Sequence, residues 1–271
     1  MRSYGEKMIN LVEFDLVRHC NFNCAKCCHF TPLVKTPWFK DLREFELEIR
    51  RVAEIISEDG AISLIGGEPF LHPQAEQFAR ITRQYLPYIN IFYTTNGSML
   101  HRLTDEQIQV INDAYAEVRM SVYPYNVDIS EVSKKINLFT TNTISEMYNL
   151  SMDLSGSQDA TKSFYACDQA YHNLEHVGNT GYGCLNLKDG ILYPCATAAN
   201  FDNFKNYFHV DIKEFYPENC GIDIFRHTAE EIEDWVSHPH DCCKYCNVEA
   251  RHNSLSPEYN RSQKSIKEWT C

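Results

Sequence analysis

The 271 residues of this chain are enough for one substantial domain, alone or with a small appendage, and 44% hydrophobic residues are ordinary for a globular protein. Acidic side chains outnumber basic ones by 37 to 25, and the formal charge of -12 argues against binding to nucleic acid or anionic lipid. The sequence has no apolar run of about 18 residues and no uninterrupted apolar stretch near its start, so we expect a cytoplasmic protein with no membrane partner.

The first half of the chain alternates between strand-like and helix-like patterns. Residues 9–17 read as a strand, and within 41–57 Phe45, Ile49 and Val52 recur at helical spacing. Further strands are predicted at 61–65, 89–95, 118–122 and 143–147, and further helices at 74–85, from Thr104 onward and at 129–136. This alternation is typical of an α/β fold with a parallel sheet and outer helices, and it leaves open whether the sheet closes into a barrel.

Four distinctive segments lie at or just after the predicted strand ends. They are Cys20–Cys27, Gly66–Pro69, Asn96–Ser98 and Ser121. Ligands of parallel α/β sheets bind at the carboxyl ends of the strands, which meet at one edge. We therefore expect these four segments to face one site.

The second half of the chain has a different composition. Beyond about residue 150 the alternation fades, and Gly, Asn, Asp, Tyr and Cys become frequent. No internal repeat or low-complexity tract is present. We expect a core domain over 1–150, continuing to about residue 165, and a small cysteine-rich appendage over 166–271.

Twelve cysteines are unusual in a chain of this length. A core this large does not need disulfides, and a reducing cytoplasm does not preserve them, so we interpret the cysteines as metal ligands. Four lie within residues 20–28 and the other eight between Cys167 and Cys271, which predicts two separate sites.

The first predicted site consists of Cys20, Cys24 and Cys27, in the loop that leaves the first strand. Three thiols at this spacing can wrap one cubane iron–sulfur cluster and leave one iron open for a substrate or cofactor. We interpret Cys28 and His29 as structural residues, because a fourth ligand would close the open iron. A structural zinc site or a disulfide is the alternative.

This loop and the sequence Gly66-Gly67-Glu68-Pro69 together resemble the radical S-adenosylmethionine (SAM) superfamily, over roughly residues 9–150. The resemblance implies a partial (β/α)6 TIM-like barrel and a [4Fe-4S] cluster whose open iron binds SAM. It also implies an electron donor such as flavodoxin or ferredoxin, reductive cleavage of SAM to a 5′-deoxyadenosyl radical, and hydrogen abstraction from a substrate.

The resemblance further implies which residues contact SAM. Gly66 and Gly67 let the backbone approach the cofactor, while Glu68 and adjacent carbonyls can accept hydrogen bonds from its ammonium group. Asn96 and Ser121 are expected to contact the ribose or carboxylate of SAM, and a simple turn at Asn96 is the alternative. The family usually has an aromatic residue where this chain has a lysine, directly before the third cysteine, so the adenine contact stays unassigned.

The second predicted site begins with a hairpin around the turn Asp189-Gly190. A two-residue turn there places Cys184 opposite Cys195, with β-carbons about 5 Å apart, where they can bind one metal or form a disulfide. A knuckle with the spacing Cys-x2-Cys follows much later and points two more thiolates at one centre. The expected ligands are Cys184, Cys195, Cys243 and Cys246, with Cys220, Cys242 and Cys271 in reserve.

This second set resembles the twitch or SPASM extension of the same superfamily, in which such cysteines bind an auxiliary [4Fe-4S] cluster. The spacing from Gly190 to Cys195 fits that pattern, and one auxiliary cluster is expected. The first ligand can be either Cys167 or Cys184. A zinc site is the alternative, because spacing does not distinguish the two metals.

Three functions are compatible with these sites. The first is a radical oxidoreductase acting on a small polar metabolite such as a sugar or aminocyclitol, with the auxiliary cluster accepting the second electron. The second is a peptide-modifying maturase of the same superfamily. The third is a non-catalytic iron–sulfur or zinc protein, which leaves Gly66–Pro69 and the three-cysteine loop unexplained.

Overall fold

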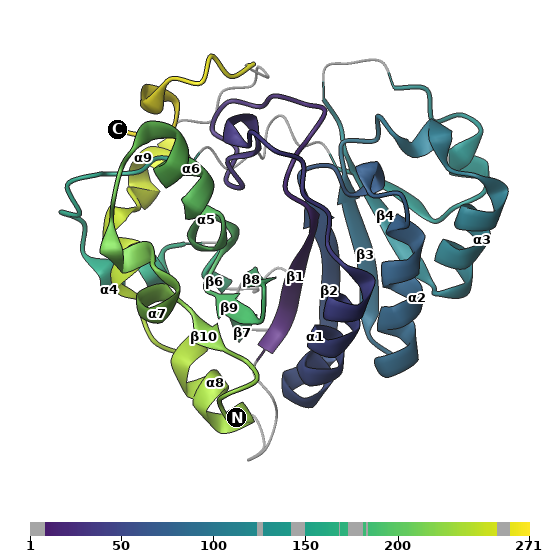
Figure 1. The fold of residues 1–271 in the computed structure, drawn as a ribbon, viewed down its shortest axis with the longest axis horizontal. Coiled ribbons are helices and arrows are strands. Elements are labelled where there is room, and N and C mark those ends of the chain that lie inside the picture. The colour runs from purple at the N-terminus through teal and green to yellow at the C-terminus, as the bar shows by residue number, and fades with distance from the viewer. Residues whose placement is uncertain are drawn as a thin grey trace.

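The computed structural model describes residues 9–123, 127–141, 150–167, 169–172, 181–182, 184–253 and 261–271. Its strands are β1 (Ile9–Val17), β2 (Ile56–Gly66), β3 (Asn90–Thr95), β4 (Ala116–Ser121), β5 (Leu138–Thr141), β6 (Tyr171–His172), β7 (Gly181–Tyr182), β8 (Leu185–Lys188), β9 (Ile191–Tyr193) and β10 (Ile222–Asp223). They form one open, mixed sheet in the order β10-β9-β8-β1-β2-β3-β4-β5, with β7 also paired to β1 and β6 paired to β7 (Figure 1). The expected α/β class and partial barrel are confirmed.

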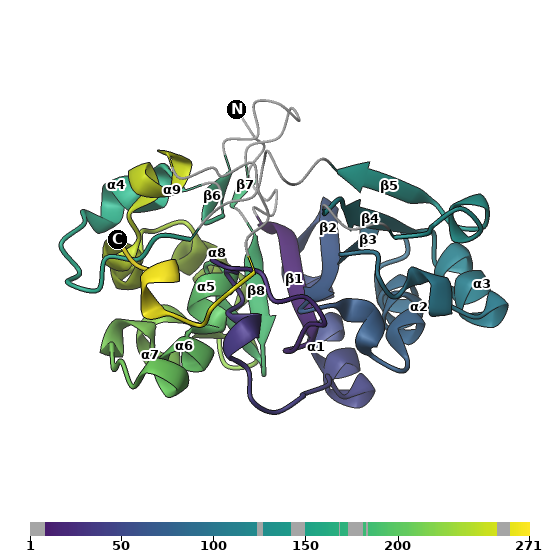
Figure 2. The same cartoon turned by 90° about the horizontal axis from the view of Figure 1, so that it is seen from above.

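Two groups of helices accompany the sheet. They are α1 (Leu42–Ile55), α2 (Ala75–Tyr85), α3 (Asp105–Asp113), α4 (Ala160–Tyr165), α5 (Ala196–Ala199), α6 (Phe201–Phe208), α7 (Pro217–Cys220), α8 (Ala229–Val236) and α9 (Val248–Asn253). The helices α1 to α3 cover the outer face of the parallel strands, and α4 to α9 gather in a second lobe beyond β8 (Figures 1 and 2). None of the helices among the described residues is both long and apolar enough to span a membrane.

The alternation of β1 explains which face meets the helices. Val12, Phe14 and Leu16 are fully buried, and Phe14 packs edge-on against Phe45 of α1 with ring centroids 4.8 Å apart. Successive side chains of a strand point to opposite faces, so Glu13 and Asp15 point to the concave side of the sheet. Both are nonetheless buried. The concave face of β1 is therefore polar and enclosed.

One predicted helix is wrong. Residues 129–136 form only a short 3-10 turn at Val132–Lys134. The carbonyl of Asn137 already accepts a 2.9 Å hydrogen bond from the amide of Val118 in β4, so the chain must leave any helix early to enter the sheet. The next strand is β5, and the strand predicted at 143–147 lies outside the described residues.

The hairpin predicted at Asp189-Gly190 is confirmed. Both turn residues have positive φ, 54° and 79°, as a type I′ turn requires, and Leu187 pairs with Leu192 in the expected register. The ladder ends at the pair Asn186 and Tyr193, so the two flanking cysteines lie just beyond it. Because β8 also pairs in parallel with β1, the sheet continues into the carboxyl-terminal half of the chain. A domain boundary near residue 150 stays a prediction.

Candidate active site

The loops after β1 and β2 cross at very short range, and two glycines allow it. The amide of Gly67 donates to the carbonyl of Val17 at 2.9 Å, and the amide of Glu68 donates to the carbonyl of His19 at 3.2 Å. A β-carbon on Gly67 would lie 1.8 Å from the His19 oxygen, and Gly66 has a φ of +120°. These glycines were expected to allow close approach of a cofactor, and the structure shows that the backbone of the same chain already requires them.

The three cysteines of the first site surround a cavity of about 410 Å³. Cys20, Cys24 and Cys27 line it together with residues from the ends of β2, β3 and β4, among them Gly66, Gly67, Asn96 and Ser121. Burial raises the pKa of the Cys20 thiol, and the nearby Glu68, Cys27 and Cys24 raise it further. The amide of Phe22 donates to the Cys20 sulfur at 3.3 Å and offsets part of this effect. The four segments that sequence analysis placed on one face do meet in one cavity.

Glu68 connects the end of β2 to the end of β3. Its fully buried carboxylate accepts hydrogen bonds from the Thr95 hydroxyl at 2.7 Å and from the Asn96 amide at 2.8 Å. Burial raises the pKa of Glu68 to about 7, although the hydrogen bonds from Thr95, Asn96 and Phe70 favour the ionised form. The position of Asn96 is therefore set by the motif Gly66–Pro69.

Asn96 in turn reaches the first cysteine loop. Its Nδ2 lies 3.6 Å from the Cys20 sulfur and donates to Asn21 Oδ1 at 3.0 Å. Its Oδ1 accepts from the Ser98 amide at 2.9 Å, which closes the local turn that sequence analysis offered as the alternative. Asn96 thus both forms the turn and faces the cavity.

Tyr123 is a residue of the site to which sequence analysis gave no role. It lines the cavity beside Ser121, and its ring meets Phe22 edge-on with centroids 5.1 Å apart. Burial and the nearby thiols of Cys24 and Cys27 raise the pKa of its hydroxyl. Its position two residues after the end of β4 places it near the site. The sequence could not predict whether its side chain points into the cavity, because a loop has no regular alternation of side chains.

A second group of thiols converges beyond the hairpin. Burial raises the pKa of Cys184, and Glu13, Cys28, Cys167 and Cys195 raise it further by their proximity. Burial likewise raises the pKa of Cys243, together with Cys195 and Cys167. Both candidates for the first ligand, Cys167 and Cys184, therefore lie in this group. Within the described ranges, no three Cys, His, Asp or Glu side chains are spaced to hold a single metal ion.

The remaining cysteines have distinct positions. The amide of Cys246 donates to the carbonyl of Cys243 at 3.1 Å, so both lie on one tight turn, and its own carbonyl accepts from the Ser163 hydroxyl. Cys220 and Cys242 form a disulfide with a Cα–Cα distance of 6.3 Å. This pair departs from the interpretation of the cysteines as metal ligands, in which Cys220 and Cys242 were reserve ligands. Its two residues are 22 positions apart, and only the packing of α7 against the turn at 241–245 brings them together.

A buried charged pair lies between the two groups of thiols. His29 Nδ1 is 3.2 Å from the Asp15 carboxylate, which also accepts from Asn200 Nδ2 at 2.8 Å. Burial opposes ionisation of Asp15, but the adjacent His29 and the amide donors lower its pKa to about 2. Although burial acts in the opposite direction, Asp15 and Cys28 hold the pKa of His29 well above its usual value. His29 thus joins the cysteine loop to β1 and to the second lobe.

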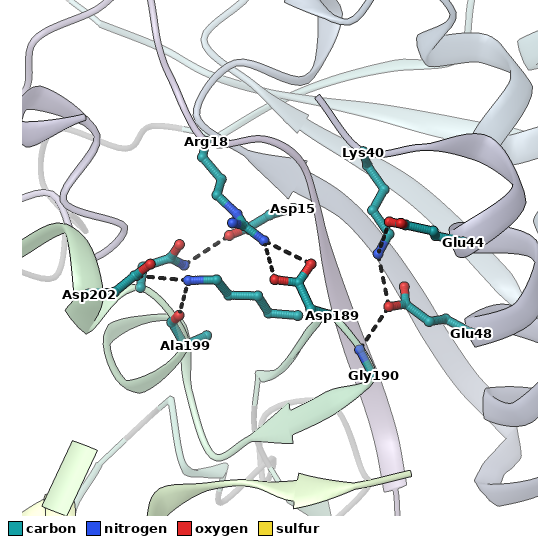
Figure 3. A network of polar contacts seen from close by, with 11 residues as sticks. Asp15, Arg18, Lys40, Glu44, Glu48, Asp189, Gly190, Ala199 and Asp202 are labelled. Atoms are coloured by element: carbon teal, nitrogen blue, oxygen red, sulfur yellow. Dashed lines mark hydrogen bonds and ion pairs between the residues drawn. The ribbon is translucent and has the colours of Figure 1, made fainter. Parts of the chain in front are cut away.

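The hairpin turn is anchored to the first half of the chain on two sides (Figure 3). Asp189 accepts two hydrogen bonds from Arg18 Nη2, at 2.8 and 3.0 Å, and the amide of Gly190 donates to Glu48 at 2.9 Å. Glu48 also pairs with the buried Lys40 at 2.8 Å. These contacts hold the hairpin, which is flanked by Cys184 and Cys195, against the end of β1 and α1.

Known proteins are similar to the part of the chain that carries this site. The model of the Radical SAM superfamily matches residues 15–144. A GTP 3',8-cyclase of Campylobacter curvus is 32% identical over 115 residues, which cover 40% of this chain and 35% of that protein. The S-adenosylmethionine-dependent nucleotide dehydratase RSAD2 of Siniperca chuatsi is 34% identical over 97 residues, which cover 33% of this chain and 25% of that protein. The chain therefore spans only about a third of the first relative's length and a quarter of the second's.

A solved structure has a similar fold over nearly the whole chain. The crystal structure of BtrN in complex with AdoMet and 2-DOIA superposes with a TM-score of 0.54 at 15% identity, over 95% of this chain and 99% of BtrN. At this identity the likeness concerns the fold alone. The family match, in contrast, covers the cysteine loop, Gly66–Pro69 and the strand ends around the cavity. Residues 15–144, just under half of the chain, are a radical SAM domain.

Proposed function

We propose that this enzyme cleaves SAM reductively and uses the resulting radical to take a hydrogen atom from a small polar metabolite, which it oxidises or otherwise modifies. The observation that carries the proposal is the single cavity of about 410 Å³ lined by Cys20, Cys24 and Cys27 and by the ends of β2, β3 and β4. Thiols on one side and polar strand ends on the other suit a cluster and a SAM molecule that share one chamber.

The residues present fit a [4Fe-4S] cluster with one open iron. When bound, the cluster supplies the electron that splits SAM into methionine and a 5′-deoxyadenosyl radical. Cys20, Cys24 and Cys27 would hold the cluster, and Gly66–Pro69, Asn96 and Ser121 would orient SAM at the open side of the loop. Glu68 would act mainly by holding Asn96, because its carboxylate already accepts from Thr95, Asn96 and Phe70.

We further propose an auxiliary [4Fe-4S] cluster at the second group of thiols. Its ligands would come from Cys184, Cys195, Cys243 and Cys246, with Cys167 as the alternative first ligand. The support is that Cys167 and Cys195 lie close enough to both Cys184 and Cys243 to raise the pKa of each. This cluster would accept the second electron when the substrate radical is oxidised, and a flavodoxin or ferredoxin would supply the first.

The concave face of the sheet also carries buried polar side chains that do not line the cavity of the three cysteines. Glu13 and Asp15 are buried there, and Asn186 donates to Asp15 at 3.3 Å from the neighbouring strand. Asp15 also accepts from Asn200 and pairs with His29, so these groups do not by themselves favour a small polar substrate over a peptide. A peptide-modifying activity is the alternative, and a test with both substrate classes decides between them.

The test is anaerobic reconstitution with iron and sulfide, followed by reductant and SAM, with 5′-deoxyadenosine measured by mass spectrometry. The wild-type chain should form 5′-deoxyadenosine, and Cys24→Ala should form none. The matched surface variant Tyr88→Ala, whose ring is 93% exposed, should behave as wild type. A reconstituted wild-type protein that forms no 5′-deoxyadenosine would overturn the proposal.

The auxiliary cluster has its own test. Cys184→Ala and Cys243→Ala should each lower the iron content by about four atoms per chain, the content of one cubane. Both variants should still cleave SAM, while turnover of an identified substrate should stop. Stoichiometric zinc in place of iron in the protein as isolated would instead assign the second site to zinc.

A further inference from the structure

The described residues 261–271, here called the strap, run along the first cysteine loop (Figure 2). Arg261 forms an antiparallel bridge to Cys24. Ser262 exchanges two hydrogen bonds with Asn23: its amide donates to the Asn23 carbonyl at 2.7 Å, and its carbonyl accepts from Asn23 Nδ2 at 3.0 Å. The strap thus pairs with the cysteine loop as a short strand would.

A buried side chain adds a third attachment at the last cysteine of the loop. Trp269 is fully buried, and its indole Nε1 donates to the carbonyl of Cys27 at 3.1 Å. The same carbonyl accepts from the amide of Phe30 at 3.0 Å, so both donors fix the orientation of the peptide that carries Cys27. The Trp269 ring also contacts Phe30 and Phe208, with centroids 6.2 and 6.0 Å apart, which ties it to the core of the second lobe.

The strap also reaches the turn of Cys243 and Cys246. Met152, fully buried, forms a parallel bridge to Thr270 and an antiparallel bridge to Cys246. Its amide donates to the Trp269 carbonyl at 2.7 Å, and its carbonyl accepts from the Cys271 amide at 3.0 Å. Backbone hydrogen bonds therefore join one end of the strap to the first cysteine loop and its other end to Met152, which bridges to Cys246.

We propose that the strap sets the position of the first cysteine loop relative to the turn of Cys243 and Cys246. Trp269 is then a positioning residue that acts through Cys27. On the side of the cavity the loop contacts Asn96, through Cys20 and Asn21, and Tyr123, through Phe22. The strap adds attachments at Asn23, Cys24 and Cys27. This inference rests on the proposed function only for its effect on the cluster, because the contacts belong to the chain alone.

The test uses two variants with matched controls. Trp269→Phe removes the indole donor and keeps an aromatic ring in the core, and Asn23→Ala removes one of the two bonds to Ser262. Trp235→Phe makes the same ring change in α8, and Asn112→Ala removes a comparable amide-to-carbonyl bond, 2.8 Å long, to Lys135. The readout is hydrogen exchange of the amides of residues 20–28 in the reconstituted full chain, together with the melting temperature.

Each of the two variants should speed exchange in residues 20–28 about fivefold, the factor that corresponds to one hydrogen bond of about 1 kcal/mol. The controls should leave exchange in this loop unchanged. Trp269→Phe should also weaken the change that SAM produces in the electron paramagnetic resonance spectrum of the reduced protein. Exchange that stays at the wild-type rate in both variants would overturn the inference. Hydrogen exchange does not depend on SAM cleavage. A wild-type protein that forms no 5′-deoxyadenosine would therefore overturn the proposed function without affecting the inference about the strap.

Discussion

The carboxylate of Glu68 accepts a 2.8 Å hydrogen bond from the backbone amide of Asn96, and through it the loop after β2 determines where the end of β3 lies. Asn96 then places its side-chain amide 3.6 Å from the Cys20 sulfur. The side chains of Glu68 and Asn96 therefore connect the two motifs of the radical SAM domain, in addition to the backbone bonds between the two loops. A substitution at Glu68 should therefore affect the cysteine loop through Asn96.

The variant Glu68→Gln tests this link. The Thr95 hydroxyl and the Asn96 amide bond to different oxygens of the carboxylate, and glutamine replaces one of these oxygens by an NH2 group that cannot accept, so one of the two donors loses its partner. A buried donor left without a partner costs about 1–3 kcal/mol, and we expect the free energy of unfolding to fall by this amount. Urea denaturation measures it. Glu131→Gln, at a carboxylate that is 78% exposed, should change stability by less than about 0.5 kcal/mol. Equal stabilities of the two variants would contradict the prediction.

Gly67→Ala tests the crossing of the two loops. The new β-carbon would lie 1.8 Å from the carbonyl oxygen of His19, which is backbone and cannot rotate away. We expect a loss of about 3 kcal/mol in stability and no 5′-deoxyadenosine formation. At Gly190, where φ is +79° and the nearest atoms, 3.2 Å away, belong to the Phe225 ring, alanine should cost about 1 kcal/mol. Both variants are compared by denaturation and by the SAM cleavage assay. The comparison separates the effect of the clash between the two loops from the effect of a side chain at a positive φ. Normal SAM cleavage by Gly67→Ala would contradict the prediction that the crossing of the two loops requires glycine at this position.

Stability should depend on pH through Glu13. Burial raises the pKa of this fully enclosed carboxyl from 4.5 to about 7. The folded state therefore binds the proton more tightly, so the unfolding free energy should fall as pH rises from about 4.5 to 7 and then level off. The fall due to this group is at most about 3 kcal/mol. Glu13→Gln should remove most of it, because an amide does not titrate. Denaturation curves from about pH 5 to 8 give the slope, and an unchanged slope in the variant would exclude Glu13 as the cause.

Sequence periodicity predicted the elements that bury one face against helices. The strands β1 to β4 and the helices α1 to α3 are in this class, because their apolar residues alternate or recur at helical spacing. The prediction at 129–136 was wrong, since the apolar residues Val132 and Ile136 fit a helical pattern but the chain joins β4 at Asn137. Periodicity reports only the local spacing of apolar residues, so it does not reveal that residue 137 must pair with β4.

Spacing predicted the first cysteine loop well but gave an incomplete account of its surroundings. Three thiols within eight positions have few ways to be arranged, and they do line one cavity. Tyr123 and the strap reach the loop from 96 or more positions away along the chain, through contacts that leave no local pattern. The pairing of Cys220 with Cys242 has the same character. Contacts of this kind follow only from the folded arrangement.

The pairing of β8 with β1 has a consequence for how the chain can be divided. A fragment cut near residue 150 would leave one side of β1 without its hydrogen-bonding neighbour. Such an open edge is a template for association with other chains. Amino-terminal and carboxyl-terminal fragments should therefore be poorly soluble when expressed apart and should recover solubility when expressed together.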